Sequence, residues 1–178
     1  MNKLFSAFLR LFAAPRLNVR EDYEKVRRMQ RHLAARPIPR YRMLDRKIMS
    51  EDGGHEIPVR FFHPKQTRRD ELLLFFHGGG WVTGDIESYT PACAAMADLT
   101  GCVVASVDYR LAPEHPFPAG LEDCLRATKL LLEDPSRAGL ESSSQVVLVG
   151  DSAGGSLAAV VSLLLRQEGR VMPGRQIL

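Results

Sequence analysis

The sequence predicts an α/β domain, in which a mostly parallel β-sheet carries helices on both of its faces. Three short and almost continuously apolar segments, residues 71–76, 102–107 and 145–149, are typical of strands that are buried on both sides. Helical patterns separate these segments, and strand–helix alternation of this kind builds a parallel sheet covered by helices. The length of 178 residues is enough for about one such domain.

The N-terminal 12 residues place their apolar side chains at helical spacing. Arg10 limits the uninterrupted apolar run to fewer residues than the ~7–15 that a secretory signal needs. We therefore expect a helix that packs its apolar face on the rest of the protein. An amphipathic helix that lies on a membrane surface is the alternative.

A second helix is predicted from Glu21 to about Ala35. Pro37 and Pro39 follow it, and proline disfavours helix both at itself and at the residue before it. The expected organisation is therefore a helical segment over residues 1–40, followed by the sheet-containing domain over residues 41–178.

The remaining elements follow from apolar patterning and turn residues. Two strands, 41–49 and 56–63, flank a Glu-Asp-Gly-Gly turn. A helix is expected from about Pro91 to Leu99, closed near Gly101. The rest of the chain predicts a proline-rich loop at 112–118, a helix at 120–132, a helix that ends near Arg166 and the start of a strand at 176–178.

Composition and charge exclude several classes of protein. With 45% hydrophobic and 25% charged residues, the chain is not wholly disordered. No segment approaches the ~20 apolar residues of a membrane span, so no stable membrane anchor is expected. Residues 1–70 hold 17 Lys and Arg against 8 Asp and Glu, whereas residues 71–178 hold 7 against 13. We interpret the basic part as a solvated face rather than a nucleic-acid site, because no RNA-binding signature accompanies it.

The three cysteines, Cys93, Cys102 and Cys124, lie in apolar surroundings and are expected in the core. Their odd number and lack of close pairing favour a reducing compartment, so the predicted location is the cytoplasm. No metal and no organic cofactor is expected.

The segment Gly150-Asp151-Ser152-Ala153-Gly154 lies between a predicted buried strand and a predicted helix. This is the context in which a tight strand-to-helix turn presents a nucleophilic serine. Glycine at the flanking positions avoids side-chain clashes in so sharp a turn. The N–H of Ala153 and the positive end of the new helix would face the site. Without this context the motif is weak, and a plain glycine–serine loop is the alternative.

A second motif, His77-Gly78-Gly79-Gly80-Trp81, directly follows the strand at 71–76. Three successive glycines allow backbone N–H groups to turn toward a ligand without interference from side chains. Such donors can stabilise an oxyanion that develops on an ester carbonyl. The alternative is a plain glycine turn. We interpret His77 as a residue that fixes this loop rather than as a catalytic base.

These two motifs and the segment Asp-Tyr-Arg-Leu-Ala-Pro-Glu-His-Pro-Phe-Pro-Ala at 108–119 resemble the hormone-sensitive-lipase-like branch of the α/β-hydrolase fold. Members of that branch are mostly carboxylesterases and lipases. The resemblance covers roughly residues 70–178 and is specific, because three motifs occur in the same order. It implies an α/β-hydrolase fold, with residues 1–40 as an N-terminal helical cap and residues 41–178 as part of the hydrolase domain.

The resemblance also implies roles for individual residues. Ser152 corresponds to the nucleophile, and Gly78, Gly79 and Ala153 correspond to the backbone donors of the oxyanion hole. We interpret the 108–119 segment as a rigid wall of the site, in which Arg110 and Glu114 combine their charges. His115 lies in this segment, but the resemblance places the catalytic base elsewhere.

The catalytic acid and histidine of the family are absent from this chain. In this fold the triad follows the order Ser, then Asp or Glu, then His. After Ser152 the sequence contains one acidic residue, Glu168, and no histidine. We therefore expect the chain to be the N-terminal part of a longer enzyme, and a truncated remnant is the alternative.

The predicted function is hydrolysis of small, partly apolar carboxylic esters by a serine esterase or lipase-like enzyme without cofactor. Activity of the 178 residues alone is doubtful in this interpretation, because a serine without a base is a poor nucleophile. One alternative is a ligand-binding or inactive protein of the same fold, and another is an amide hydrolase. The expected partner is a small-molecule ester, and the sequence leaves the oligomeric state open.

Overall fold

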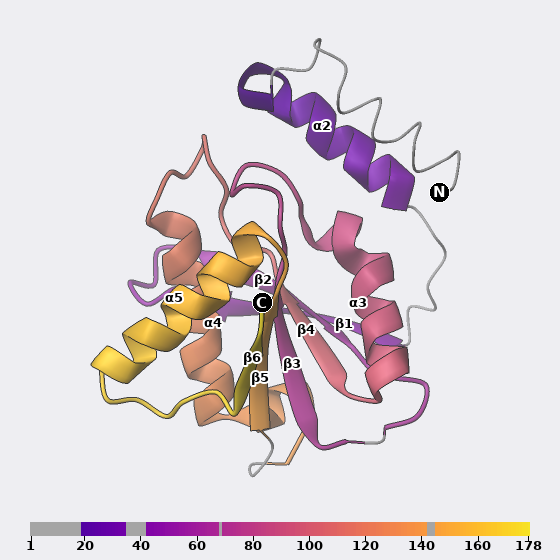
Figure 1. The fold of residues 1–178 in the computed structure, drawn as a ribbon, viewed down its shortest axis with the longest axis vertical. Coiled ribbons are helices and arrows are strands. Elements are labelled where there is room, and N and C mark those ends of the chain that lie inside the picture. Colours follow the sequence, from indigo (N-terminus) through magenta and orange to yellow (C-terminus); the bar gives the residue numbers. More distant parts are fainter. Residues whose placement is uncertain (1–18, 35–41, 68, 142–144) are drawn as a thin grey trace.

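The structure is a computed structural model, which describes residues 19–34, 42–67, 69–141 and 145–178. Its described strands form one six-stranded sheet in the order β1-β2-β4-β3-β5-β6 (Figure 1). The strands are β1 (Met43–Met49), β2 (Glu56–Phe62), β3 (Glu71–Phe76), β4 (Val103–Val107), β5 (Gln145–Gly150) and β6 (Arg175–Ile177).

Strand directions divide the sheet into two parts. Strand β3 pairs in parallel with both β4 and β5, and β6 pairs in parallel with β5. At the other side, β2 pairs antiparallel with β4, and β1 pairs antiparallel with β2. The mostly parallel sheet predicted from the sequence is thus confirmed.

Helices cover both faces of the sheet, as predicted. Figure 1 shows α3 (Ile86–Thr100) on one face and α4 (Ala119–Glu133) together with α5 (Ala153–Gln167) on the other. A short 3₁₀ helix, η2 (Pro135–Ala138), follows α4. This is a three-layer arrangement of helix, sheet and helices.

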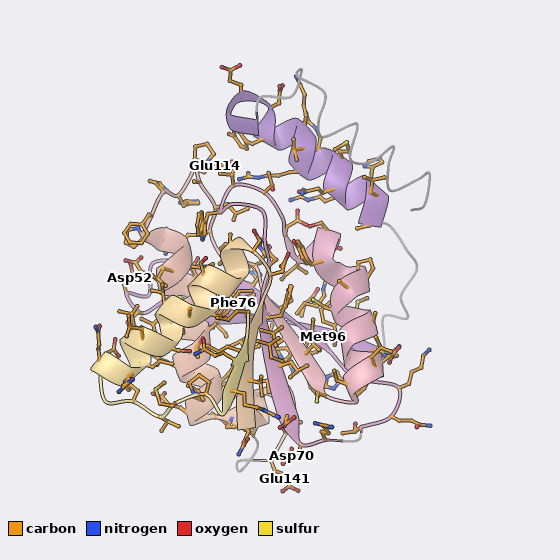
Figure 2. The ribbon with its side chains drawn as sticks, in the orientation of Figure 1. Asp52, Asp70, Phe76, Met96, Glu114 and Glu141 are labelled. Atoms are coloured by element: carbon orange, nitrogen blue, oxygen red, sulfur yellow. The ribbon has the colours of Figure 1, made fainter. Side chains whose placement is uncertain are left out.

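Strand β3 illustrates why the central strands are apolar throughout. Leu72, Leu74 and Phe76 belong to the core beneath α4 and α5, whereas Leu73 and Phe75 belong to the core beneath α3. Successive side chains of a strand point to opposite faces, so both sets are buried only if helices cover both faces. Phe76 is fully buried near the middle of the molecule (Figure 2).

Helix α3 begins earlier than predicted. The sequence pattern predicted a start at about Pro91, but the helix starts at Ile86 and Pro91 lies inside it. The reason is a capping box, in which the Asp85 side chain accepts from the Ser88 N–H while the Ser88 hydroxyl accepts from the Asp85 N–H. Reciprocal capping of this kind defines the first turn of a helix, so the helix start is set at Asp85 rather than at the proline.

The predicted helix over residues 21–35 is confirmed as α2 (Val19–Ala34), which lies beside α3 (Figure 1). It meets the body largely through polar side chains. Arg31 pairs with Asp85, and the Gln30 side chain accepts from the Gly84 N–H. Val26 of the same helix is buried. The helix predicted over residues 1–12 lies outside the described residues.

Within the described ranges, no helix combines the length and apolar character needed to cross a membrane.

Candidate active site

The candidate site lies where three parallel strands end. His77 follows β3, Asp108 follows β4, and Asp151 follows β5. The carboxyl ends of parallel strands meet at one edge of a sheet, and ligands of open α/β sheets bind there. The fold therefore brings together the two glycine-containing motifs and the 108–119 segment.

Ser152 occupies a strained turn between β5 and α5. Its backbone has φ 50° and ψ −116°, and its side chain is exposed. Positive φ is unfavourable for a residue with a Cβ, and such strain is concentrated at functional sites. The turn is tight enough to exclude other residues at Gly154, where an added Cβ would lie 2.0 Å from the Phe76 carbonyl oxygen. The structure thus has the tight strand-to-helix turn expected at this position, and the role of Ser152 as nucleophile stays a prediction.

Asp151, next to Ser152, connects the two motifs. Its carboxylate accepts hydrogen bonds from the Gly78 N–H at 2.8 Å and from the Tyr89 hydroxyl at 3.0 Å. Burial and the nearby Asp151 carboxylate raise the pKa of Tyr89 to about 12, so that this hydroxyl stays protonated and donates. Asp151, the first variable position of the Gly-x-Ser-x-Gly motif, therefore links this motif to the glycine loop. The sequence did not indicate this role.

The bond to Asp151 changes the expectation for the oxyanion hole. Gly78 was predicted as a backbone donor, but its N–H is engaged by the Asp151 carboxylate. The carbonyl oxygen of Gly79 accepts from the N–H groups of Val82 and Thr83 at 3.2 and 2.9 Å. The N–H and the C=O of one trans peptide point in opposite directions. The N–H of Gly80 therefore points away from this turn, and Gly80 itself lines the pocket described below.

Gly79 has a reason to be glycine that is independent of catalysis. Its φ is +117°, and an added Cβ would lie 2.2 Å from the Thr83 carbonyl oxygen. Ala153 opens α5 and is buried. The first N–H groups of a helix have no partner within the helix, which leaves the Ala153 N–H as a potential donor. No contact in the structure tests the roles of Gly79 and Ala153 as oxyanion donors, and they remain predictions.

His77 fixes the glycine loop, as predicted. Its side chain is fully buried, and its Nδ1 lies 2.9 Å from the Gly78 carbonyl oxygen. The ring stacks on that of Tyr109 with 4.2 Å between centroids, and the Tyr109 hydroxyl donates to the His77 carbonyl oxygen at 2.6 Å. Burial lowers the pKa of His77, so that the ring is neutral near pH 7 and a structural partner rather than a charge.

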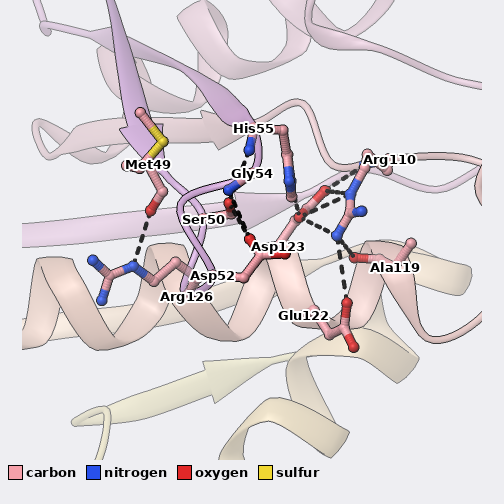
Figure 3. A network of polar contacts seen from close by, with 10 residues as sticks. All are labelled: Met49, Ser50, Asp52, Gly54, His55, Arg110, Ala119, Glu122, Asp123 and Arg126. Atoms are coloured by element: carbon pink, nitrogen blue, oxygen red, sulfur yellow. Dashed lines mark hydrogen bonds and ion pairs between the residues drawn. The ribbon is translucent and has the colours of Figure 1, made fainter.

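The predicted pairing of Arg110 with Glu114 is wrong. Arg110 bonds instead to the Asp123 carboxylate through its backbone N–H, Nε and Nη2, and it also reaches Glu122 (Figure 3). Asp123 is 1% exposed and also lies 2.8 Å from Nε2 of His55. A buried carboxylate requires such partners. This cluster ties the 108–119 segment to α4 and to the β1–β2 turn, which supports its interpretation as a rigid wall.

A pocket of about 410 Å³ opens between the glycine loop and α5. Ser156, whose N–H donates to the Ser152 carbonyl oxygen at 3.2 Å, is one of its lining residues. Residues from the glycine loop, from the 108–119 segment with the start of α4, and from the first turns of α5 line it. They are Gly80, Trp81, Arg110, Ala112, His115, Phe117, Pro118, Gly120, Leu121, Ser156, Leu157 and Val160. The lining of this pocket could not be predicted from the sequence, because it comes from three separate segments.

The other chemistry-bearing residues are placed as follows. Cys93, Cys102 and Cys124 are buried and free, which confirms them as core residues. Burial raises the pKa of the Cys93 thiol to about 12, which keeps it protonated. In the part of the chain that the structure describes, no group of three or more His, Cys, Asp and Glu side chains could hold a metal ion. All five histidines precede Ser152 in the sequence.

Comparison with known proteins agrees with this geometry. A family model described as the alpha/beta hydrolase fold matches residues 73–178. The carboxylesterase NlhH of Mycobacterium tuberculosis is 38% identical over 152 residues, which are 84% of this chain and 47% of that protein. The arylesterase of Saccharolobus solfataricus is 34% identical over 148 residues, which are 82% of this chain and 47% of that protein.

Solved structures give the same result. The esterase of the archaeon Pyrobaculum calidifontis superposes with a TM-score of 0.74 at 38% identity, over 89% of this chain and 50% of that one. An ester hydrolase from the metagenome of Lake Arreo, complexed with a bipyridine phosphonate derivative, superposes with a TM-score of 0.83 at 29% identity, over 98% of this chain and 56% of that one. The chain thus spans about half the length of the curated relatives it matches. Because the family model matches more than half of the sequence and the fold agrees, the chain belongs to the alpha/beta hydrolase fold family.

Proposed function

We propose that this chain carries the nucleophile and the oxyanion donors of a carboxylic-ester hydrolase. The main supporting observation is Ser152, which is exposed on a strained turn with φ 50°. Ser156, which bonds to the Ser152 carbonyl oxygen, lines a pocket of about 410 Å³. Strain of about 1–3 kcal/mol at one residue persists only where the surroundings impose it. The esterase relatives, 38% and 34% identical, support the same reaction class.

The proposed reaction is acyl transfer through Ser152. The Ser152 Oγ attacks the ester carbonyl carbon while its proton passes to a general base, and the carbonyl oxygen becomes an oxyanion. The oxyanion collapses and the alcohol leaves with a proton, so that the acyl group is esterified to Oγ. Water then attacks this acyl-enzyme and releases the carboxylic acid and free Ser152. The family resemblance implies that this general base is a histidine.

The oxyanion is proposed to accept hydrogen bonds from the N–H groups of Gly79, Gly80 and Ala153. We prefer Gly80 to Gly78 because Asp151 engages the Gly78 N–H, while Gly80 lines the pocket. Each such donor contributes about 10²–10³-fold to kcat in serine hydrolases. In this scheme Asp151 holds the glycine loop against the nucleophile turn.

The pocket supports a substrate with a small apolar part. Its walls include Trp81, Phe117, Leu121, Leu157 and Val160. Apolar walls of this kind bind an alkyl or aryl group by removing its surface from water. We therefore propose small, partly apolar esters as the substrate class, as expected from the sequence.

A phosphonate ester tests the proposal on the full-length gene product. A p-nitrophenyl alkylphosphonate should release p-nitrophenolate and leave the phosphonyl group on Ser152, identified by peptide mass. Ser152→Ala should abolish labelling and lower kcat for p-nitrophenyl butyrate by about 10⁶-fold.

Ser136→Ala is the matched control, because Ser136 is exposed on η2, at a position that does not line the pocket. Unchanged labelling in Ser152→Ala, or an adduct on another residue, would reject Ser152 as the nucleophile. Rates for the p-nitroanilide of butyric acid, measured in parallel, distinguish an ester hydrolase from an amide hydrolase.

A further inference from the structure

Arg27 of α2 binds two loops of the body with a single guanidinium group. Its Nε donates to the Val82 carbonyl oxygen at 2.8 Å. Its Nη2 donates to the Ala112 carbonyl oxygen at 3.0 Å. Nη1 and Nη2 also donate to the two carboxylate oxygens of Glu114 at 2.8 and 3.1 Å. The Tyr23 ring lies on the same guanidinium, 4.7 Å from its centroid to the arginine Cζ.

The bonded groups belong to two loops that contribute residues to the lining of the pocket. Val82 directly follows Gly80 and Trp81, which line the pocket, and Ala112 lines it as well. The two loops also bond to each other, because the Ala112 N–H donates to the Trp81 carbonyl oxygen at 2.9 Å. Figure 2 shows Glu114 on the loop that faces α2.

The contact requires the shape of arginine. A guanidinium has five N–H donors in one rigid plane, and the described contacts use donors on three nitrogens toward three different residues. The Arg27 side chain is 16% exposed although it is charged, whereas its neighbour Arg28 on the same helix is exposed. Arg27 therefore lies at a junction between three segments that are distant in the sequence.

We infer that Arg27 is a positioning residue, which holds the glycine loop and the 108–119 segment at the spacing that the substrate pocket requires. This inference rests on the proposed function, since the pocket is taken as the site of the acyl or alcohol group. Arg27 does not touch the reacting atoms. It acts through Val82, two residues after Gly80, and through Ala112 in the facing wall. The helix α2 thereby becomes part of the site although none of its residues lines the pocket.

The single tryptophan of the sequence reports on this junction directly. Trp81 lines the pocket, and the next residue is the one whose carbonyl Arg27 binds. Arg27→Met keeps the length of the side chain and removes its donors, so Trp81 should become more accessible to acrylamide quenching. Arg28→Met is the matched control, because it makes the same change of charge on the exposed side of the same helix. It should leave quenching unchanged.

Kinetics of the full-length gene product provide the second readout. Displacement of catalytic groups by about 1 Å lowers rates by roughly 10²-fold, so Arg27→Met should lower kcat for p-nitrophenyl butyrate by about 10- to 100-fold. Arg27→Lys should recover part of this loss, because lysine keeps the charge but not the planar set of donors. Glu114→Gln, which keeps a side-chain acceptor, tests the same junction if Arg27→Met does not fold, and it should also increase quenching.

The outcomes separate this inference from the proposed function. Increased quenching in Arg27→Met and Glu114→Gln, but not in Arg28→Met, supports the positioning role even if no variant hydrolyses the ester. Equal quenching in wild type and both junction variants would overturn it, and so would an equal effect of Arg28→Met. Failure of phosphonate labelling at Ser152 would instead reject the proposed function and leave the quenching result standing.

Discussion

Replacement of Ser152 by glycine removes the proposed nucleophile, yet we expect it to stabilise the fold. The φ of 50° and ψ of −116° at Ser152 cost about 1–3 kcal/mol for a residue with a Cβ. Glycine avoids this strain, but its greater freedom in the unfolded chain offsets about 0.4–1 kcal/mol. The Ser152 side chain is exposed and makes no capping bond to α5, so the substitution removes no helix cap. The net gain is about 1 kcal/mol, or about 2–4 °C in melting temperature for a chain of this size.

Thermal unfolding followed by circular dichroism measures this effect. Ser152→Ala is the matched variant, because it removes the same hydroxyl but keeps the Cβ and therefore the strain. The expected order of melting temperature is Ser152→Gly above Ser152→Ala, with Ser152→Ala close to the wild type. If Ser152→Gly melts at or below Ser152→Ala, the turn is not strained in the folded protein, and the argument from strain to function fails.

Three further predictions concern other parts of the site. Gly154→Ala should lower the midpoint of urea unfolding, because the added Cβ would lie 2.0 Å from the Phe76 carbonyl oxygen. Such crowding costs about 1–3 kcal/mol. An unchanged midpoint would contradict the close approach. Asp123→Asn should lower the free energy of unfolding by about 1.5–3 kcal/mol, measured by denaturation, because charged hydrogen bonds to a 1% exposed carboxylate are lost. The hydrogen bond from Arg27 lowers the pKa of Glu114 below its usual 4.5, so the bonded carboxylate stabilises the folded state above pH 4.5 and this contribution is lost as the pH falls through the lowered pKa. Tryptophan quenching should therefore rise as the pH falls through this lowered pKa, and the rise should be absent in Glu114→Gln.

Local patterns in the sequence were sufficient to predict most of the fold. The apolar runs at 71–76, 102–107 and 145–149 became β3, β4 and β5 with small changes at their ends. Strands buried on both faces must be apolar at every position, so their signal does not depend on the rest of the chain. The start of α3 was missed because the rule against proline outweighed the Asp85–Ser88 capping box, which was visible in the sequence.

In the candidate site, too, local features were predicted and long-range contacts were not. Ser152 and the glycine loop were predicted because a tight turn between strand and helix demands particular residues at fixed spacing. The use of the Gly78 N–H by Asp151 could not be predicted, since these residues are 73 positions apart and meet only when β3 pairs with β5. The partners of Arg110 and Glu114 were misassigned for the same reason, because charge alone does not select among many possible partners.

The sequence by itself thus determined the order of the elements, the tight turn at Ser152 and the apolar core, since each depends on residues that are neighbours along the chain. Only the tertiary structure decided which backbone donors stay free, which segments line the pocket and which arginine joins its two loops. These properties depend on the directions and distances of groups from separate segments. Such groups acquire defined positions only after the sheet and its helices have packed together.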